Sequence, residues 1–448
     1  MAGNAGESSR NHTCVGIIDY HGDSSSNSSI FKVPQVLRRQ KEAAYTPDVV
    51  SIGPYHATGG EQFEPMEKVK RRYLQELLSH MKIDLETLIG FVIKSSVIGK
   101  EGTVEFEKRA RAFYAEPLEH LSSKCFVEMM VLDACFMIQL FRKSLNGQSK
   151  KDISDPSDID PVFGVPCMFQ YVCHDLLLLE NQIPWFVIES IYNVTVDKYP
   201  GIYPAPLPRL VLVSLSTLRP LHHSCNSYIN KIDSGDKDNG VDKILHILHL
   251  IRTSIVFPLK GKSKGHHLKL HVMHRATALS KAGIKFKRTK PAQSIMMMNF
   301  EKGDFTIPQL AIGELTESLF RNLIALEQCY HAYWNEITSY AILMDKLIIS
   351  SEDMRVLCEA GVIANWLSAE DGTKFFNNLY NGTWLETFYY GELCDKVNKY
   401  YDEEWNVWWE LLKREKFSSP WKIISLILAI ILLGLTLWQT VYNIRDRM

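Results

Sequence analysis

The feature that most constrains this chain is an uncharged stretch close to its C-terminus. From Ile423 to Ile444 the sequence contains no Asp, Glu, Lys or Arg and is rich in Ile and Leu. As a helix with a rise of about 1.5 Å per residue, this stretch would be about 33 Å long, enough to cross a hydrocarbon core of about 30 Å. The sequence therefore predicts a single transmembrane helix, with a buried core helix as the alternative.

The residues at the two ends of this stretch also suit a membrane helix. Ser419 can cap its start, Pro420 fits the first helical position, and aromatic residues stand where the two interfaces would be. We therefore expect a transmembrane segment over 420–444, a short tail over 445–448 and the lipid bilayer as a partner. The anchor residues would be Pro420, Trp421, Ile423, Leu437, Trp438 and Tyr442.

Charges beside the stretch indicate an orientation. Four basic residues precede or begin it, namely Lys413, Arg414, Lys416 and Lys422, and two follow it, Arg445 and Arg447. A basic excess marks the cytosolic side, and the N-terminus has no signal-peptide pattern, so the body is expected in the cytosol, with the plasma membrane as the expected location. Glycosylation triplets at Asn11, Asn27, Asn193 and Asn381 leave the opposite placement open.

Composition excludes several classes of function. Hydrophobic residues make up 46% of the chain and charged residues 23%, and the formal net charge is −1. This balance is typical of a globular protein and gives no reason to expect nucleic acid as a partner. The nine cysteines include no CxxC pair, so we expect neither a disulfide framework nor a zinc site among them, and no cofactor.

Helical spacing of apolar residues dominates the body. Met66, Val69, Tyr73, Leu77 and Met81 follow it, with basic residues on the other side. Lys124–Leu145 is apolar nearly all round, which predicts a central core helix. Cys173–Tyr192 continues the core, with Pro184 expected to kink or divide it.

Strand signals are confined to a short region. Ser294–Phe300 and Phe305–Ile307 flank a turn that contains Gly303, a pattern that predicts a β-hairpin. The predicted fold is therefore mainly α with a small β-hairpin element (α+β), a helical globular body plus one C-terminal transmembrane helix. We expect a disordered tail over 1–29 and a body over 30–416, with polar loops near 144–161, 197–209 and 230–243.

Four carboxylates are the strongest candidates for chemistry. They stand in strongly apolar helical sequence, where an unpaired charge would cost several kcal/mol. They must therefore be paired, hydrogen-bonded or protonated, and a structural network is favoured over an acid–base pair. These candidates are Glu128, Asp133, Asp175 and Glu180.

Other motifs are weaker. Among His266, His267, His271 and His274, two residues could share a helix face as metal ligands, but no HExxH occurs. Gly261-Lys262-Ser263 ends like a P-loop but lacks its first glycine, and the basic cluster at Lys281, Lys285, Lys287, Arg288 and Lys290 is expected to be a solvated strand edge. A stripe of Trp405, Trp408 and Leu412 on a long helix predicted over Trp384–Lys416 is either a partner-binding face or core packing.

The order of several sequence blocks resembles the plant domain-of-unknown-function 247 family, also called the UPF0481 proteins. The blocks include IFKVP, SIGPYH, FVEMMVLDACFMIQLF, DLLLLENQIPWFVIE and TESLFRNLIALEQC. The family has no agreed activity, so the resemblance implies a plant membrane protein and no catalytic residues. We expect a recognition, signalling or scaffold protein that binds another protein, with an uncharacterised hydrolase-like enzyme using the buried carboxylates as the alternative. Sequence does not indicate the oligomeric state.

Overall fold

The computed structural model describes residues 28–445 apart from fourteen short gaps. These gaps are 58–59, 97–101, 146–159, 166, 199–204, 219, 235–243, 260–265, 268–272, 290–293, 331–332, 334, 386 and 404–419. Helices dominate the described residues and the few strands are short, as the sequence predicted. Residues 1–27 of the predicted tail and parts of the three predicted polar loops lie outside the described residues, and Ser29 is buried.

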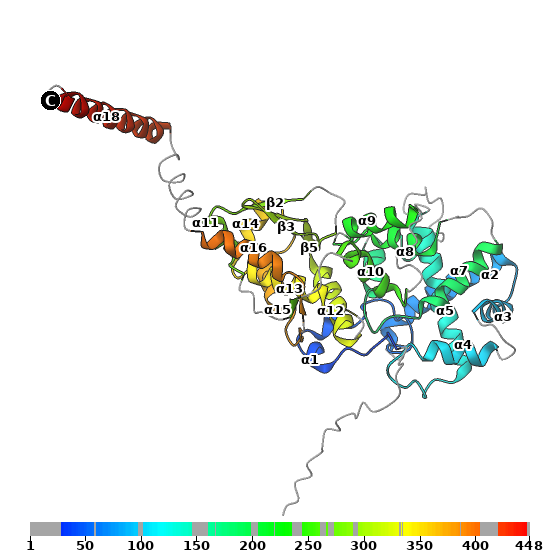
Figure 1. Ribbon diagram of the computed structural model, residues 1–448. Coiled ribbons are helices and arrows are strands. Elements are labelled where there is room, and N and C mark those ends of the chain that lie inside the picture. The colour runs from blue at the N-terminus through cyan, green and yellow to red at the C-terminus, as the bar shows by residue number, and fades with distance from the viewer. Residues whose placement is uncertain are drawn as a thin grey trace, which may run out of the picture.

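The first part of the chain forms a layer of helices around α5 (Figure 1). α5 packs against α2, α4, α7 and α8, and its core-facing side chains are almost completely buried. The helices are α1 (Gln35–Arg38), α2 (Glu64–Met81), α3 (Leu85–Ser96), α4 (Gly102–Arg111), α5 (Ser123–Leu145), α6 (Met168–Asp175), α7 (Trp185–Lys198), α8 (Leu207–Leu215), α9 (His222–Asp233) and α10 (Ile247–Val256).

The second part of the chain mixes helices with short strands. β2, β4 and β3 form a three-stranded sheet, in which β2 runs parallel and β3 antiparallel to β4, while β5–β6 and β1–β7 are separate pairs. The elements are β1 (His266–His267), α11 (Ala276–Lys281), β2 (Lys285–Arg288), β3 (Asn299–Glu301), β4 (Asp304–Ile307), β5 (Leu310–Ile312), α12 (Glu314–Cys329), α13 (Glu336–Leu347), α14 (Ser351–Glu359), β6 (Ile363–Asn365), α15 (Ala369–Asn378), β7 (Thr387–Phe388), α16 (Gly391–Asp402) and α18 (Pro420–Arg445).

Local sequence signals explain several of these boundaries. α2 has Pro65 in its first turn and is followed by Lys82, whose φ of 52° places it in the left-handed region. Ser350 and Asp353 form a capping box at the start of α14, and Gly361, with φ of 70°, follows its end. The predicted hairpin is confirmed as β3–β4, although the sequence did not indicate that β2 adds to it in parallel.

The helix predicted over Cys173–Tyr192 is instead two helices separated by a buried irregular segment. α6 ends at Asp175, and α7 starts at Trp185, directly after Pro184. Asn181 Nδ2 donates to the Asp175 carbonyl (2.9 Å), and Gln182 Nε2 donates to the Leu176 carbonyl (2.7 Å). These side chains satisfy carbonyls at the end of α6, which lets the chain leave the helix without burying unpaired acceptors.

The predicted transmembrane helix is wrong. Among the described residues, no helix combines the length and the apolarity that a membrane crossing requires. α18 (Pro420–Arg445) covers the predicted segment. The single-pass, tail-anchored fold class and the location derived from it, a plasma-membrane protein with a cytosolic body, are therefore not supported.

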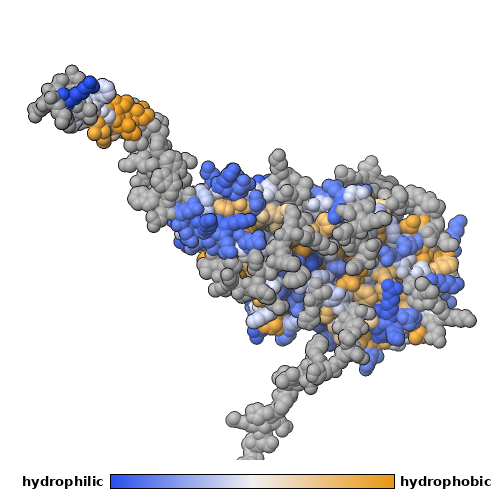
Figure 2. Space-filling view, in the orientation of Figure 1, coloured by the Kyte–Doolittle hydropathy of each residue, from blue (hydrophilic) through white to orange (hydrophobic). Residues whose placement is uncertain are grey.

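The anchor residues that depended on that span are placed only in part. Leu437 and Trp438 are 60% and 75% exposed on α18. The side chains of Pro420, Trp421, Ile423 and Tyr442 are not described. On the face of the body seen in Figure 2, hydrophobic residues gather only in small areas between hydrophilic ones.

Candidate functional site

α5 separates two of the four predicted carboxylates. Asp133 faces the core and is 1% exposed, whereas the side chain of Glu128 is 43% exposed and lies 3.9 Å from Lys124. Five residues along a helix correspond to a rotation of about 140°, so the two side chains point to different faces. Glu128 therefore does not join the buried carboxylates.

Asp133 belongs to a buried ion-pair cluster with α2. Its Oδ1 lies 2.7 Å from Lys70 Nζ, which lies 2.6 Å from Glu67 Oε1 and also donates to the Ser51 carbonyl. Burial alone would lower the pKa of Lys70, but the Asp133 and Glu67 carboxylates outweigh it and raise this pKa above its ordinary value. The charge of Lys70 is thus kept inside the core.

Gly53 brings the N-terminal segment onto Asp133. Its amide donates to Asp133 Oδ2 at 2.7 Å. Gly53 has φ of 71°, and a Cβ built on it would lie 2.6 Å from the Gln182 carbonyl oxygen. Only glycine adopts this conformation without strain and leaves room for the Gln182 carbonyl. Gly53, the glycine of SIGPYH, is therefore needed for the N-terminal segment to reach Asp133.

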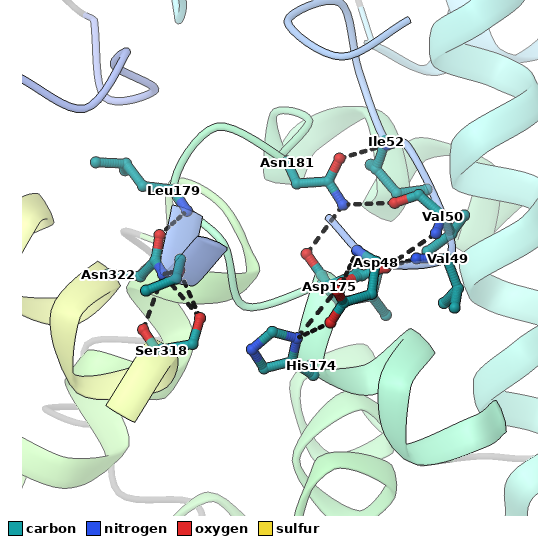
Figure 3. Close-up of polar contacts among 12 residues, drawn as sticks. Asp48, Val49, Val50, Ile52, His174, Asp175, Leu179, Asn181, Ser318 and Asn322 are labelled. Carbon is teal, nitrogen blue, oxygen red and sulfur yellow. Dashed lines mark hydrogen bonds and ion pairs between the residues drawn. The ribbon is translucent and has the colours of Figure 1, made fainter. Parts of the chain in front are cut away.

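Asp175 and Asn181 hold the residues just before Gly53 (Figure 3). Asp175 is completely buried, and its carboxylate accepts the amides of Asp48 (3.0 Å), Val49 (2.8 Å) and Val50 (2.9 Å). Asn181 Oδ1 accepts the Ile52 amide (2.6 Å), and its Nδ2 donates to the Val50 carbonyl (3.0 Å). Side chains thus replace the backbone partners that a strand or helix would supply.

Glu180 anchors the first part of the same segment. Its Oε1 accepts the Val33 amide (2.6 Å) and Arg38 Nη2 (2.5 Å), and its Oε2 lies 3.3 Å from His56 Nε2. Burial raises the pKa of Glu180, but the hydrogen bonds from His56, Arg38 and Val33 outweigh burial and leave this pKa below its ordinary value.

Asp133, Asp175 and Glu180 therefore share one structural task. Together with Asn181 they bind residues 33–53, a segment without long regular elements, to the helical layer. We call these four side chains the cradle. These contacts support a structural role for the three buried carboxylates, because each accepts a hydrogen bond from at least one backbone amide.

A hollow of about 370 Å³ lies next to the cradle. α6 contributes Tyr171 and His174, the connection after α8 contributes Leu218, and Leu319 belongs to α12. Trp366, which follows β6, stands at the hollow with 67% of its surface exposed, and its amide donates to the Ile312 carbonyl (3.0 Å). Most of the side chains that line the hollow are apolar, which suits an apolar ligand group.

His174 connects the hollow with the cradle. The residue is 4% exposed, and neither ring nitrogen has a hydrogen-bond partner within the described residues. Its Nδ1 lies 3.4 Å from Asp175 Oδ1 and 3.9 Å from Asp48 Oδ2, and Figure 3 shows this ring edge facing the two carboxylates. The sequence analysis missed His174 and Asp48, because 126 residues separate these two positions in the chain and no local motif joins them.

Most of the histidine cluster singled out in the sequence lies outside the described side chains. His271 lies outside the described residues, and His266 and His267 form β1, whose side chains are not described. His274 stacks on Tyr401 with 3.9 Å between the ring centroids. The P-loop-like triplet and the stripe of Trp405, Trp408 and Leu412 also lie outside the described residues.

The basic cluster is a solvent-exposed strand edge where it is described. Lys281, Lys285, Lys287 and Arg288 are exposed at α11 and β2, and Lys287 Nζ lies 2.5 Å from Asp304 Oδ2 on the paired strand. Lys290 is not described. An exposed pair of this kind contributes about 0–1 kcal/mol to stability.

Comparison with known proteins identifies relatives over almost the whole chain. A family model for a plant protein of unknown function, domain-of-unknown-function 247, matches residues 30–435. The UPF0481 protein At3g47200 of Arabidopsis thaliana is 29% identical over 436 residues, which cover 92% of this chain and 85% of that protein. The putative UPF0481 protein At3g02645 of the same plant is 22% identical over 494 residues, covering 92% and 89% respectively. No solved structure matches.

Proposed function

This chain belongs to the plant domain-of-unknown-function 247 family, as the resemblance of its sequence blocks predicted, and we propose that it acts by binding another polypeptide. The family is one of unknown function, so the proposal depends on the site itself. The observation that carries it is the apolar hollow with Trp366 exposed beside it.

The shape of the site favours an inserted side chain of a partner. The volume of about 370 Å³ lies at the lower end of the range for pockets that enclose whole small molecules, about 300–1,000 Å³. Trp is among the residue types that contribute most to protein–protein binding, and a two-thirds-exposed Trp beside an apolar hollow fits that role. We commit to a polypeptide segment that places one aromatic or aliphatic side chain between Trp366 and Leu319.

The contacts around the hollow support binding over catalysis. Asp133 and Glu180 do not line it, and Asp175 uses its carboxylate on three backbone amides. His174 lines it, but within the described residues its ring nitrogens make no hydrogen bond to the thiol of Cys167 or to any other group. A nucleophilic enzyme needs such a pair of nucleophile and base, so the hydrolase alternative has no support in these contacts.

Selection of peptides from a random displayed library against the full chain tests the proposal. We expect the selected peptides to share an aromatic or aliphatic anchor residue. Trp366→Ala should weaken their binding about 30-fold or more, the loss expected for a hot-spot residue worth about 2 kcal/mol.

The matched control is Trp384→Ala. Trp384 is 77% exposed, and its amide donates to Gln328 near the other end of α12, away from the hollow. This variant should bind the selected peptides as the wild type does. Failure to select any peptide, or equal binding by Trp366→Ala, would overturn the proposal.

A further inference from the structure

One polar cluster beside the cradle has the composition of a metal site. Asp48, His174 and Asp175 each place one possible ligand atom within 4.8 Å of the others. We propose that these three side chains bind a divalent transition-metal cation of the Zn²⁺ class, with one nitrogen and two oxygen ligands. The proposal does not depend on peptide binding in the hollow.

The state of His174 is the second observation that points to a ligand. Its imidazole is 4% exposed, and Nδ1 makes no hydrogen bond within the described residues although it faces the Asp48 and Asp175 carboxylates (Figure 3). Buried polar groups in native proteins are nearly always hydrogen-bonded or ligate a metal. A cation between Nδ1 and the two carboxylates would give this nitrogen the partner that it lacks.

Asp175 is already fixed in the orientation that a ligand needs. Its Oδ2 accepts two backbone amides and its Oδ1 accepts one, which leaves a lone pair of Oδ1 directed to other groups. Hydrogen bonds of this kind orient the carboxylates that ligate metals. Only a small rotation of the His174 and Asp48 side chains would then be needed for all three to bind one cation.

Asp48 opens the cluster to solvent. Its side chain is 53% exposed, whereas those of His174 and Asp175 are buried. The backbone amide of Asp48, and not its carboxylate, donates to Asp175 in the cradle. The carboxylate is therefore able to turn toward an incoming cation without disturbing the contacts that hold residues 48–50.

The distances favour a transition metal over calcium or magnesium. Two ligands of a tetrahedral ion with bonds of about 2.0–2.1 Å lie about 3.3 Å apart, close to the 3.4 Å between His174 Nδ1 and Asp175 Oδ1. The 3.9 Å to Asp48 Oδ2 requires a small rotation of an exposed side chain. Calcium and magnesium prefer all-oxygen sites, whereas an imidazole with carboxylates suits Zn²⁺.

Calorimetric titration of the purified full chain with ZnCl₂ tests the proposal. The nine cysteines offer other zinc ligands, so the readout is the difference in stoichiometry between variants. Asp48→Asn and His174→Gln should each lose one saturable site, or weaken it at least tenfold, while circular dichroism shows an unchanged fold. Asp402→Asn, an exposed carboxylate far along the chain, serves as the control and should titrate as the wild type does.

Two outcomes would overturn the assignment. One is a wild-type titration whose stoichiometry Asp48→Asn leaves unchanged. The other is the absence of any saturable Zn²⁺ binding to the wild-type chain. If His174→Gln does not fold, Asp48→Asn still decides, because the Asp48 carboxylate has no role in the contacts of the cradle.

Discussion

Two regions of this molecule bury carboxylates in different ways. In the cradle, Asp175 and Glu180 accept hydrogen bonds from backbone amides, and these bonds fix both the carboxylates and the N-terminal segment. In the second region, Glu327 and Glu336 share the guanidinium of Arg252, which is 5% exposed and lies 3.8 Å from the Tyr333 ring centroid. We call this second region the arginine centre.

The two carboxylates of the arginine centre have different hydrogen-bond partners. Glu327 accepts Arg252 Nη2 (2.8 Å) and the amides of Ile337 (3.0 Å) and Thr338 (2.9 Å) at the start of α13. The Glu336 carboxylate also accepts a hydrogen bond from Arg252 Nη2. Burial, with a further contribution from the Glu327 charge, raises the pKa of Glu336 to about 7 despite Arg252. Burial therefore outweighs the nearby cation at Glu336.

The largest effect is expected for Lys70→Met. This substitution leaves the Asp133 carboxylate buried without its cation, and breaking a buried pair from one side costs about 3–5 kcal/mol. Urea denaturation should show that loss in the free energy of unfolding. Lys68→Met is the control, because Lys68 is 72% exposed and its contact with Glu64 at 3.6 Å is worth less than about 1 kcal/mol. Equal losses in the two variants would show that Asp133 does not need Lys70.

Asp175→Ala should cost about 2–4 kcal/mol. It leaves the amides of Asp48, Val49 and Val50 buried or half-buried without an acceptor, and each unsatisfied group costs about 1–3 kcal/mol where water cannot reach it. Hydrogen exchange, measured with EDTA present, should show faster exchange at these three amides before the rest of the fold is affected. Unchanged protection at 48–50 would contradict the role of the cradle. Asp233→Ala, which removes an exposed partner of Arg209, should not change these rates.

Glu336→Gln should change how stability depends on pH. The pKa of Glu336 is about 7 in the folded chain against an ordinary value of 4.5. Between these values the folded state holds more protons than the unfolded state, so stability contributed by this group falls as pH rises from about 5 to 7. The variant lacks this loss, and its stability relative to wild type should increase by about 1–3 kcal/mol between pH 5 and pH 8. Denaturation midpoints at the two pH values measure it.

The control for that measurement is Glu352→Gln. The Glu352 side chain is 57% exposed and pairs with Arg355, so its replacement should leave the pH dependence unchanged. A Glu336→Gln variant that follows the wild-type curve would show that Arg252 alone keeps Glu336 ionised at pH 5. The contrast between the two regions would then disappear.

Sequence patterns predicted the elements whose cause is local. The helix expected over Lys124–Leu145 is α5 and the hairpin is β3–β4, because periodicity and turn residues act over a few residues. The cradle could not be predicted in the same way. Its contacts join positions such as Val33 and Glu180, which are 147 residues apart, through irregular backbone without periodicity. The uncharged C-terminal stretch predicted a membrane span that no described helix provides.

The smallest effect is expected for Glu128→Gln. This variant tests whether a carboxylate that interrupts an apolar helical sequence is exposed, as Glu128 is, or buried, as Asp133 is. Glu128 and Asp133 interrupt the same helix, but the 43% exposed side chain of Glu128 keeps its hydration, and Lys124 at 3.9 Å adds little. Its replacement should change the free energy of unfolding by less than about 0.5 kcal/mol, the range for exposed substitutions. A loss of several kcal/mol would mean that Glu128 is buried in the working protein, and the face that α5 turns to the core would have to be reassigned.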